Sequence, residues 1–119
     1  MKYGLSTDDI GTLKRILANY PDILEVWLFG SRTTDNYHAG SDVDLAVMNA
    51  SVSGKVIRQV RSDIEDSNLP YFVDIINFHE LKHPGLKEQI IRAGRLFYSN
   101  VPVPVVNDRK ACYPEESKE

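Results

Sequence analysis

Three aspartates in two apolar segments are the residues of this 119-residue chain best suited to chemistry. Asp42 and Asp44 stand two apart in residues 42–48, where apolar and polar side chains alternate as in a strand, so both should project from one face. Asp74 lies within the apolar run 72–76. Strands rarely bury acids, because gathered carboxylates repel and are costly to desolvate. Either the three bind a hard divalent cation, or Asp42 and Asp44 cap a strand end and Asp74 pairs with an arginine.

A Gly-Ser pair directly follows an apolar segment of strand length, residues 23–29. Glycine lets the backbone approach a ligand, and a helix start after it would present free N–H groups to an anion. Ser31 adds a hydroxyl and Arg32 a fixed positive charge. A bare Gly-Ser pair could be a plain strand-to-helix turn. The combination of Gly30-Ser31, ten residues, and Asp42-Val43-Asp44 carries more information, and it predicts a metal–phosphate site.

These residues resemble the active-site signature of the DNA polymerase beta-like nucleotidyltransferases, which has Gly-Ser, then Asp-x-Asp, then a downstream Asp. The small size and the stretches Trp-Leu-Phe-Gly-Ser-Arg and Gly-Ser-Asp-Val-Asp-Leu-Ala-Val resemble the minimal nucleotidyltransferases (MNT) of prokaryotes. The resemblance covers about residues 5–98. Family members of this kind are commonly the antitoxin of a HEPN-domain ribonuclease toxin, and some transfer AMP from ATP to a tyrosine of the toxin.

The resemblance implies a role for each site residue. Asp42, Asp44 and Asp74 would bind two Mg²⁺ ions, or Mn²⁺, with Asp74 also the general base; Gly30, Ser31 and Arg32 would bind the phosphates of ATP. The expected partner is a HEPN toxin. Two alternatives stay open: nucleotidyl transfer to a small molecule or an RNA end, perhaps through a homo-oligomer, and a stoichiometric binding antitoxin without catalysis.

The segments that must position these residues alternate between helical and strand patterns. Ser6 and Ser53 are hydroxyl residues at the starts of helical patterns, Asn19-Tyr20-Pro21 ends the first of them, and Pro84 suits a first helical turn. The expected helices cover residues 6–18, about 53–66 and 84–93, with a short helix start in 32–41, and the expected strands cover 23–29, 42–48, 71–78 and 96–98. This order predicts an α/β or α+β fold, and the resemblance implies a small mixed β-sheet flanked by helices.

Composition and charge exclude several classes of protein. The net charge of −3 disfavours a general nucleic-acid coat, which must neutralise phosphates. No apolar run approaches the roughly 20 residues of a membrane span, and the N-terminus lacks the apolar core of a signal peptide. The lone Cys112 cannot form an internal disulfide, so a cytoplasmic location is expected. We expect a nucleotidyltransferase domain over 1–98 and an extended, flexible tail over 99–119.

Two weaker patterns have mainly structural explanations. Lys55, Arg58 and Arg61 recur every three residues along the second long helix, which favours a solvated basic face over a phosphate or acidic-partner contact. His79 and His83 have a spacing that can bind zinc on a helix, but Pro84 follows at once and no further Cys or His supports a site. We expect structural or surface roles for both histidines.

Overall fold

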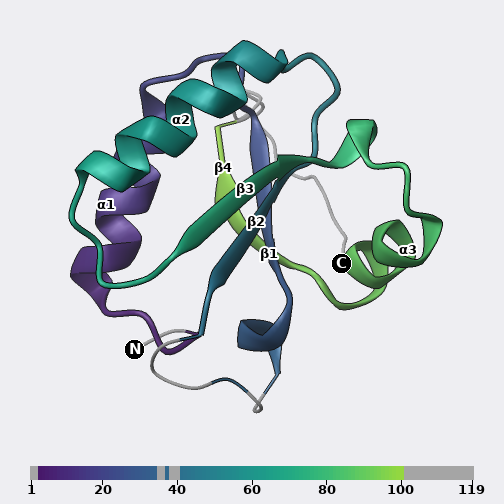
Figure 1. The fold of residues 1–119 in the computed structure, drawn as a ribbon, viewed down its shortest axis with the longest axis horizontal. Coiled ribbons are helices and arrows are strands. Elements are labelled where there is room, and N and C mark those ends of the chain that lie inside the picture. The colour runs from purple at the N-terminus through teal and green to yellow at the C-terminus, as the bar shows by residue number, and fades with distance from the viewer. Residues whose placement is uncertain (1–2, 35–36, 38–40, 101–119) are drawn as a thin grey trace, which may run out of the picture.

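The computed structural model describes residues 3–34, 37 and 41–100. These residues form one four-stranded sheet in the order β3-β2-β1-β4, together with helices on both of its faces (Figure 1). In chain order the elements are α1 (Thr7–Ala18), β1 (Glu25–Phe29), the 3-10 turn η1 (Ser31–Thr33), β2 (Val43–Val47), α2 (Gly54–Asp66), β3 (Val73–Asn77), the 3-10 turn η2 (Phe78–Glu80), α3 (Pro84–Ala93) and β4 (Arg95–Ser99).

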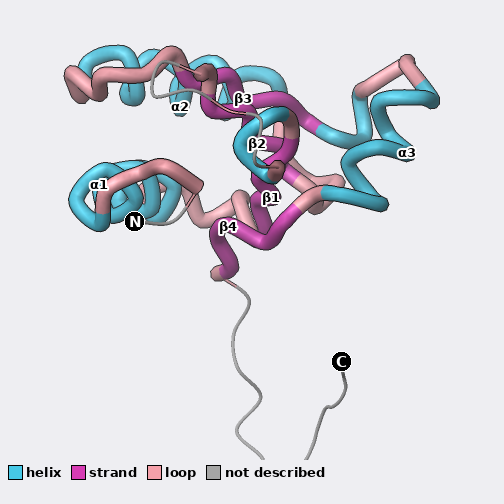
Figure 2. The backbone as a smooth tube through the Cα atoms, turned by 90° about the horizontal axis from the view of Figure 1, so that it is seen from below, coloured by secondary structure: helices cyan, strands magenta, loops and turns pink. Residues whose placement is uncertain are grey.

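The sheet is mixed, as the family resemblance implies. Strand β1 pairs antiparallel with both β2 and β4, whereas β2 and β3 are parallel. Helices α1 and α2 cover one face and α3 lies on the other (Figure 2). The parallel pair matters for function, because parallel neighbours bring equivalent positions of two strands side by side.

The larger core lies between the sheet and helices α1 and α2. It takes every second residue of β2, so the intervening Asp44 and Ala46 face the α3 side. Its strand and helix members include Leu13, Leu17, Val26, Leu28, Val43, Leu45, Val47, Ile57, Val60, Ile64, Val73 and Ile75. A smaller cluster of Phe29, Ala46 and Ile90 packs α3 against the opposite face. The strand alternation therefore points the acids away from the main core.

The helices begin where hydroxyl caps predict them. The Ser6 side chain accepts a hydrogen bond from the Asp9 backbone N–H, and Ser53 accepts one from that of Val56. Helix α3 has the predicted bounds, and strands β1, β2 and β3 are each shorter than the apolar patterns that predict them.

The sheet extends slightly beyond the expected domain boundary at residue 98. Strand β4 runs to Ser99, and the Asn100 backbone N–H donates to the Leu24 carbonyl at 2.8 Å. The remainder of the expected tail, 101–119, and with it Cys112, lies outside the described residues. None of the helices in the described ranges has the length and apolar character needed to cross a membrane.

Candidate active site

The parallel pairing of β2 with β3 places two of the predicted site residues next to each other. Asp44 and Asp74 are direct register partners, and Asp42 lies two residues before Asp44. Burial raises the pKa of Asp44, and the negative charges of Asp42 and Asp74 raise it further. Asp42 and Asp74 thus both lie close enough to act electrostatically on Asp44, which faces the side of the sheet that carries α3.

The Gly-Ser turn lies directly against one of these carboxylates. Gly30 has φ +86° and ψ −158°, a conformation open to almost no residue but glycine. A Cβ atom built on Gly30 would lie 2.5 Å from Oδ2 of Asp44. The exposed Ser31 follows at the start of η1, where the Thr33 backbone N–H and hydroxyl both donate to the Gly30 carbonyl, at 3.1 and 2.7 Å. The predicted helix start is therefore one short 3-10 turn.

Arg32, predicted to bind phosphate, is buried and contacts two backbone carbonyls. Its side chain is 1% exposed, and Nε and Nη2 donate to the Ser41 carbonyl at 3.1 and 2.8 Å. Nη1 donates to the Tyr3 carbonyl at 2.8 Å, and the guanidinium lies 4.9 Å from the centre of the Tyr71 ring. Arg32 thus links the turn after Gly30 to the residue that immediately precedes Asp42, and its phosphate-binding role stays a prediction.

Asp74 is paired with an arginine, which was one of the alternatives open from the sequence. Its Oδ1 lies 3.4 Å from Nη2 of Arg61 on α2, and both side chains are less than half exposed. Between residues 3 and 100, in the parts described, no three His, Cys, Asp or Glu side chains are gathered as a metal ion would need. The donor atoms nevertheless fit a hard divalent cation, because carboxylate oxygens are its preferred ligands. Such a cation would offset the repulsion from Asp42 and Asp74 that contributes to the raised pKa of Asp44.

The family to which this chain belongs follows from its match to a known protein family. The family described as "Polymerase beta, Nucleotidyltransferase" matches residues 11–102, most of the chain. The chain belongs to the polymerase beta nucleotidyltransferase family. In this family member the Gly-Ser turn and the three aspartates all lie within the matched region. Among curated proteins, none matches the sequence.

Solved structures with the same fold include several toxin–antitoxin complexes. One described as a toxin–antitoxin with AMP-PNP has a TM-score of 0.61 and 24% identity, covering 81% of this chain and 75% of that one. The MntA–HepT toxin–antitoxin gives 0.58 and 18%, with coverages of 80% and 74%. A tri-AMPylated Shewanella oneidensis HEPN toxin in complex with an MNT antitoxin gives 0.54 and 21%, with coverages of 78% and 69%. At these identities the likeness shows the nucleotidyltransferase fold.

The two histidines singled out in the sequence of this nucleotidyltransferase make local structural contacts. Nε2 of His79 lies 2.7 Å from the Met48 carbonyl, and Nδ1 of His83 accepts from the Leu86 backbone N–H at the start of α3. The prediction of structural roles for both histidines is confirmed. The contact of Arg61 with Asp74 was missed as an individual pair, although the basic repeat on α2 was the signal that could have found it.

Proposed function

We propose that this nucleotidyltransferase is an Mg²⁺-dependent antitoxin that transfers AMP from ATP to a hydroxyl of a HEPN toxin, specifically to a tyrosine. The observation that carries the proposal is the close approach of Gly30 to Asp44, whose Oδ2 would lie 2.5 Å from a Cβ atom on Gly30, together with the pairing of Asp44 with Asp74. A phosphate-binding turn and clustered carboxylates must be adjacent for nucleotidyl transfer, because the metal ions link the phosphates to the protein.

The chemistry divides among the chain's own residues. Asp42, Asp44 and Asp74 would hold two Mg²⁺ ions, which neutralise phosphate charge and lower the pKa of the acceptor hydroxyl. Asp74 accepts the proton of that hydroxyl at a carboxylate oxygen. The hydroxyl oxygen bonds to the α-phosphorus while the bond from that phosphorus to the bridging oxygen breaks. Ser31 and the adjoining backbone donate to the β- and γ-phosphates, which leave as pyrophosphate.

Support for this acceptor and nucleotide comes from the structural neighbours. They are described as MntA–HepT complexes, as a complex with AMP-PNP and as a tri-AMPylated HEPN toxin with its MNT antitoxin. This chain shares their nucleotidyltransferase fold over about four fifths of its length. We expect it to meet its HEPN partner in the cytoplasm and to use ATP.

One observation favours a second candidate function, neutralisation of the toxin by binding alone. Asp74, the proposed base, is occupied by Arg61 rather than gathered with Asp42 and Asp44 in a metal-binding arrangement. A stoichiometric antitoxin would retain the fold and the partner without needing the carboxylate charges.

Protection of the HEPN toxin at sub-stoichiometric antitoxin, with ATP and Mg²⁺ present, separates the two functions. The catalytic proposal expects one wild-type molecule to inactivate many toxin molecules. The Asp42→Asn, Asp44→Asn double variant should lose this sub-stoichiometric inactivation. Asp66→Asn, the same chemical change on an exposed residue of α2, should protect as the wild type does. Protection that always requires one antitoxin per toxin, with or without the two charges, would establish the binding function instead.

A further inference from the structure

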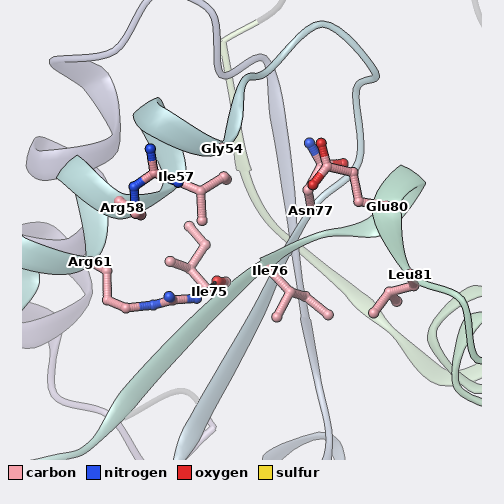
Figure 3. A pocket seen from close by; sticks show the side chains of 9 residues that line it. All are labelled: Gly54, Ile57, Arg58, Arg61, Ile75, Ile76, Asn77, Glu80 and Leu81. Carbon is pink, nitrogen blue, oxygen red and sulfur yellow. Dashed lines mark hydrogen bonds between the residues drawn. The ribbon is translucent and has the colours of Figure 1, made fainter.

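A groove of about 380 Å³ runs along the free edge of β3, between α2 and η2 (Figure 3). Arg58 and Arg61 reach into it from successive turns of α2, and Glu80 and Leu81 line its other side. Because β3 pairs with β2 alone among the described strands, no described strand partners the Ile75 carbonyl on its outer edge.

Arg61 holds both this edge and Asp74 through one nitrogen. Its Nη2 donates to the Ile75 carbonyl at 2.6 Å and lies 3.4 Å from Oδ1 of Asp74. The carbonyl contact is much the shorter, so it fixes where the guanidinium sits, and the carboxylate meets a positive charge that the strand has already anchored. Nε of Arg61 is buried and has no hydrogen-bond partner. The buried Nε and the short contact of Nη2 with the Ile75 carbonyl leave the arginine little freedom to follow the carboxylate if Asp74 moves.

The ion pair also acts on the repulsion between Asp74 and its neighbour on β2. Asp44 and Asp74 are register partners on parallel strands, so two carboxylates lie side by side in this part of the sheet. Attraction to Arg61 offsets part of that repulsion while no cation is bound. A divalent ion that uses Asp74 must therefore compete with the guanidinium for this carboxylate.

We infer that Arg61 is the positioning residue of Asp74: it holds the carboxylate toward the edge of β3 in the metal-free protein and yields it when a divalent cation binds. The inference rests on the proposed function, because it requires Asp74 to be a metal ligand. The competing explanation is that Arg61 only covers the Ile75 carbonyl and blocks edge-to-edge association.

Mn²⁺ binding to the full chain without nucleotide, followed by the electron paramagnetic resonance signal of free Mn²⁺, tests the inference. Arg61→Gln should bind Mn²⁺ about threefold to fivefold more tightly than the wild type, the range expected from losing a half-exposed ion pair. Arg61→Lys keeps the positive charge and should bind as the wild type does. Arg58→Gln is the matched control. It removes the same charge one helical turn from Arg61, and Arg58 makes no ion pair in the described ranges.

Equal Mn²⁺ affinity of wild type and Arg61→Gln would overturn the inference, and so would an equal gain in Arg58→Gln, which would reflect net charge alone. Should Arg61→Gln fail to fold, a crystal structure of the wild type with Mn²⁺ decides: the Nη2–Oδ1 distance should exceed 4 Å, against 3.4 Å here. A retained pair beside a bound ion would contradict the inference. If the wild type binds Mn²⁺ no better than Asp44→Asn, the proposed metal site itself fails.

Discussion

Gly30→Ala should damage the site through two separable effects. The first is backbone strain, because φ +86° with ψ −158° is a region that costs a residue with a Cβ about 1–3 kcal/mol. The second is steric, because the new Cβ would lie 2.5 Å from Oδ2 of Asp44; since this oxygen ends a side chain that can rotate, relieving the overlap costs about 0.5–1.5 kcal/mol more. The carboxylate must turn aside, and a misplacement of about 1 Å can reduce the rate of the chemical step about 10²-fold.

Asp44→Ala provides the background that separates these effects. Without the carboxyl group, the next atom of residue 44 near the new Cβ is its own Cβ, at 3.5 Å, an ordinary contact. In that background Gly30→Ala should cost only the backbone strain, so a double-mutant cycle measured by urea unfolding should show a coupling of about 0.5–1.5 kcal/mol.

Gly11→Ala is the control for a glycine with no such constraint. Gly11 lies inside α1, and a Cβ atom added to it would have nothing within 4 Å, so alanine should stabilise the protein by about 0.5–1 kcal/mol. The reasoning is refuted if Gly30→Ala unfolds like the wild type, or if its cost is the same with and without the Asp44 carboxyl group.

Two further substitutions test the site's electrostatics and its scaffold. Asp44→Asn should stabilise the metal-free protein at about pH 7 but not at about pH 3. The pKa of Asp44 is raised in the folded protein, so at pH values above the ordinary pKa of 3.8 its ionisation opposes folding. Equal gains in thermal stability at both pH values would contradict this. Arg32→Ala should lower the free energy of unfolding by about 3–5 kcal/mol, because it leaves the carbonyls of Ser41 and Tyr3 without their buried donor; a loss below about 1 kcal/mol in urea unfolding would show that the link is dispensable.

The elements were largely predictable because their signals are local. A hydroxyl cap such as Ser53 and a proline at the first turn of α3 act on neighbouring residues, so the sequence locates those helix starts well. Strand ends are set by pairing across the sheet, and β3 accordingly begins two residues after its apolar pattern does.

The site was predictable where its residues are close in sequence or share a strand face. The side on which Asp44 projects follows from strand alternation, and its register with Asp74 required the fold. The contacts of Arg32 could not be predicted, because its partners are the carbonyls of Tyr3 and Ser41, 29 and 9 residues away. Every residue has a backbone carbonyl, so residue types do not reveal which one is contacted. For the same reason the anchoring of Arg61 on the Ile75 carbonyl was invisible in the basic repeat of α2.

Transfer of label from α-³²P-ATP to the purified HEPN toxin, in the presence of this chain and Mg²⁺, tests the central claim most directly. We predict label on the toxin, at a tyrosine, that requires Mg²⁺ and that disappears with Asp42→Asn and Asp44→Asn while the variants remain folded and still bind the toxin. Label that persists in the folded double variant would contradict the assignment of these carboxylates. Absence of label with the wild-type chain, under conditions in which it binds and silences the toxin, would contradict the catalytic account.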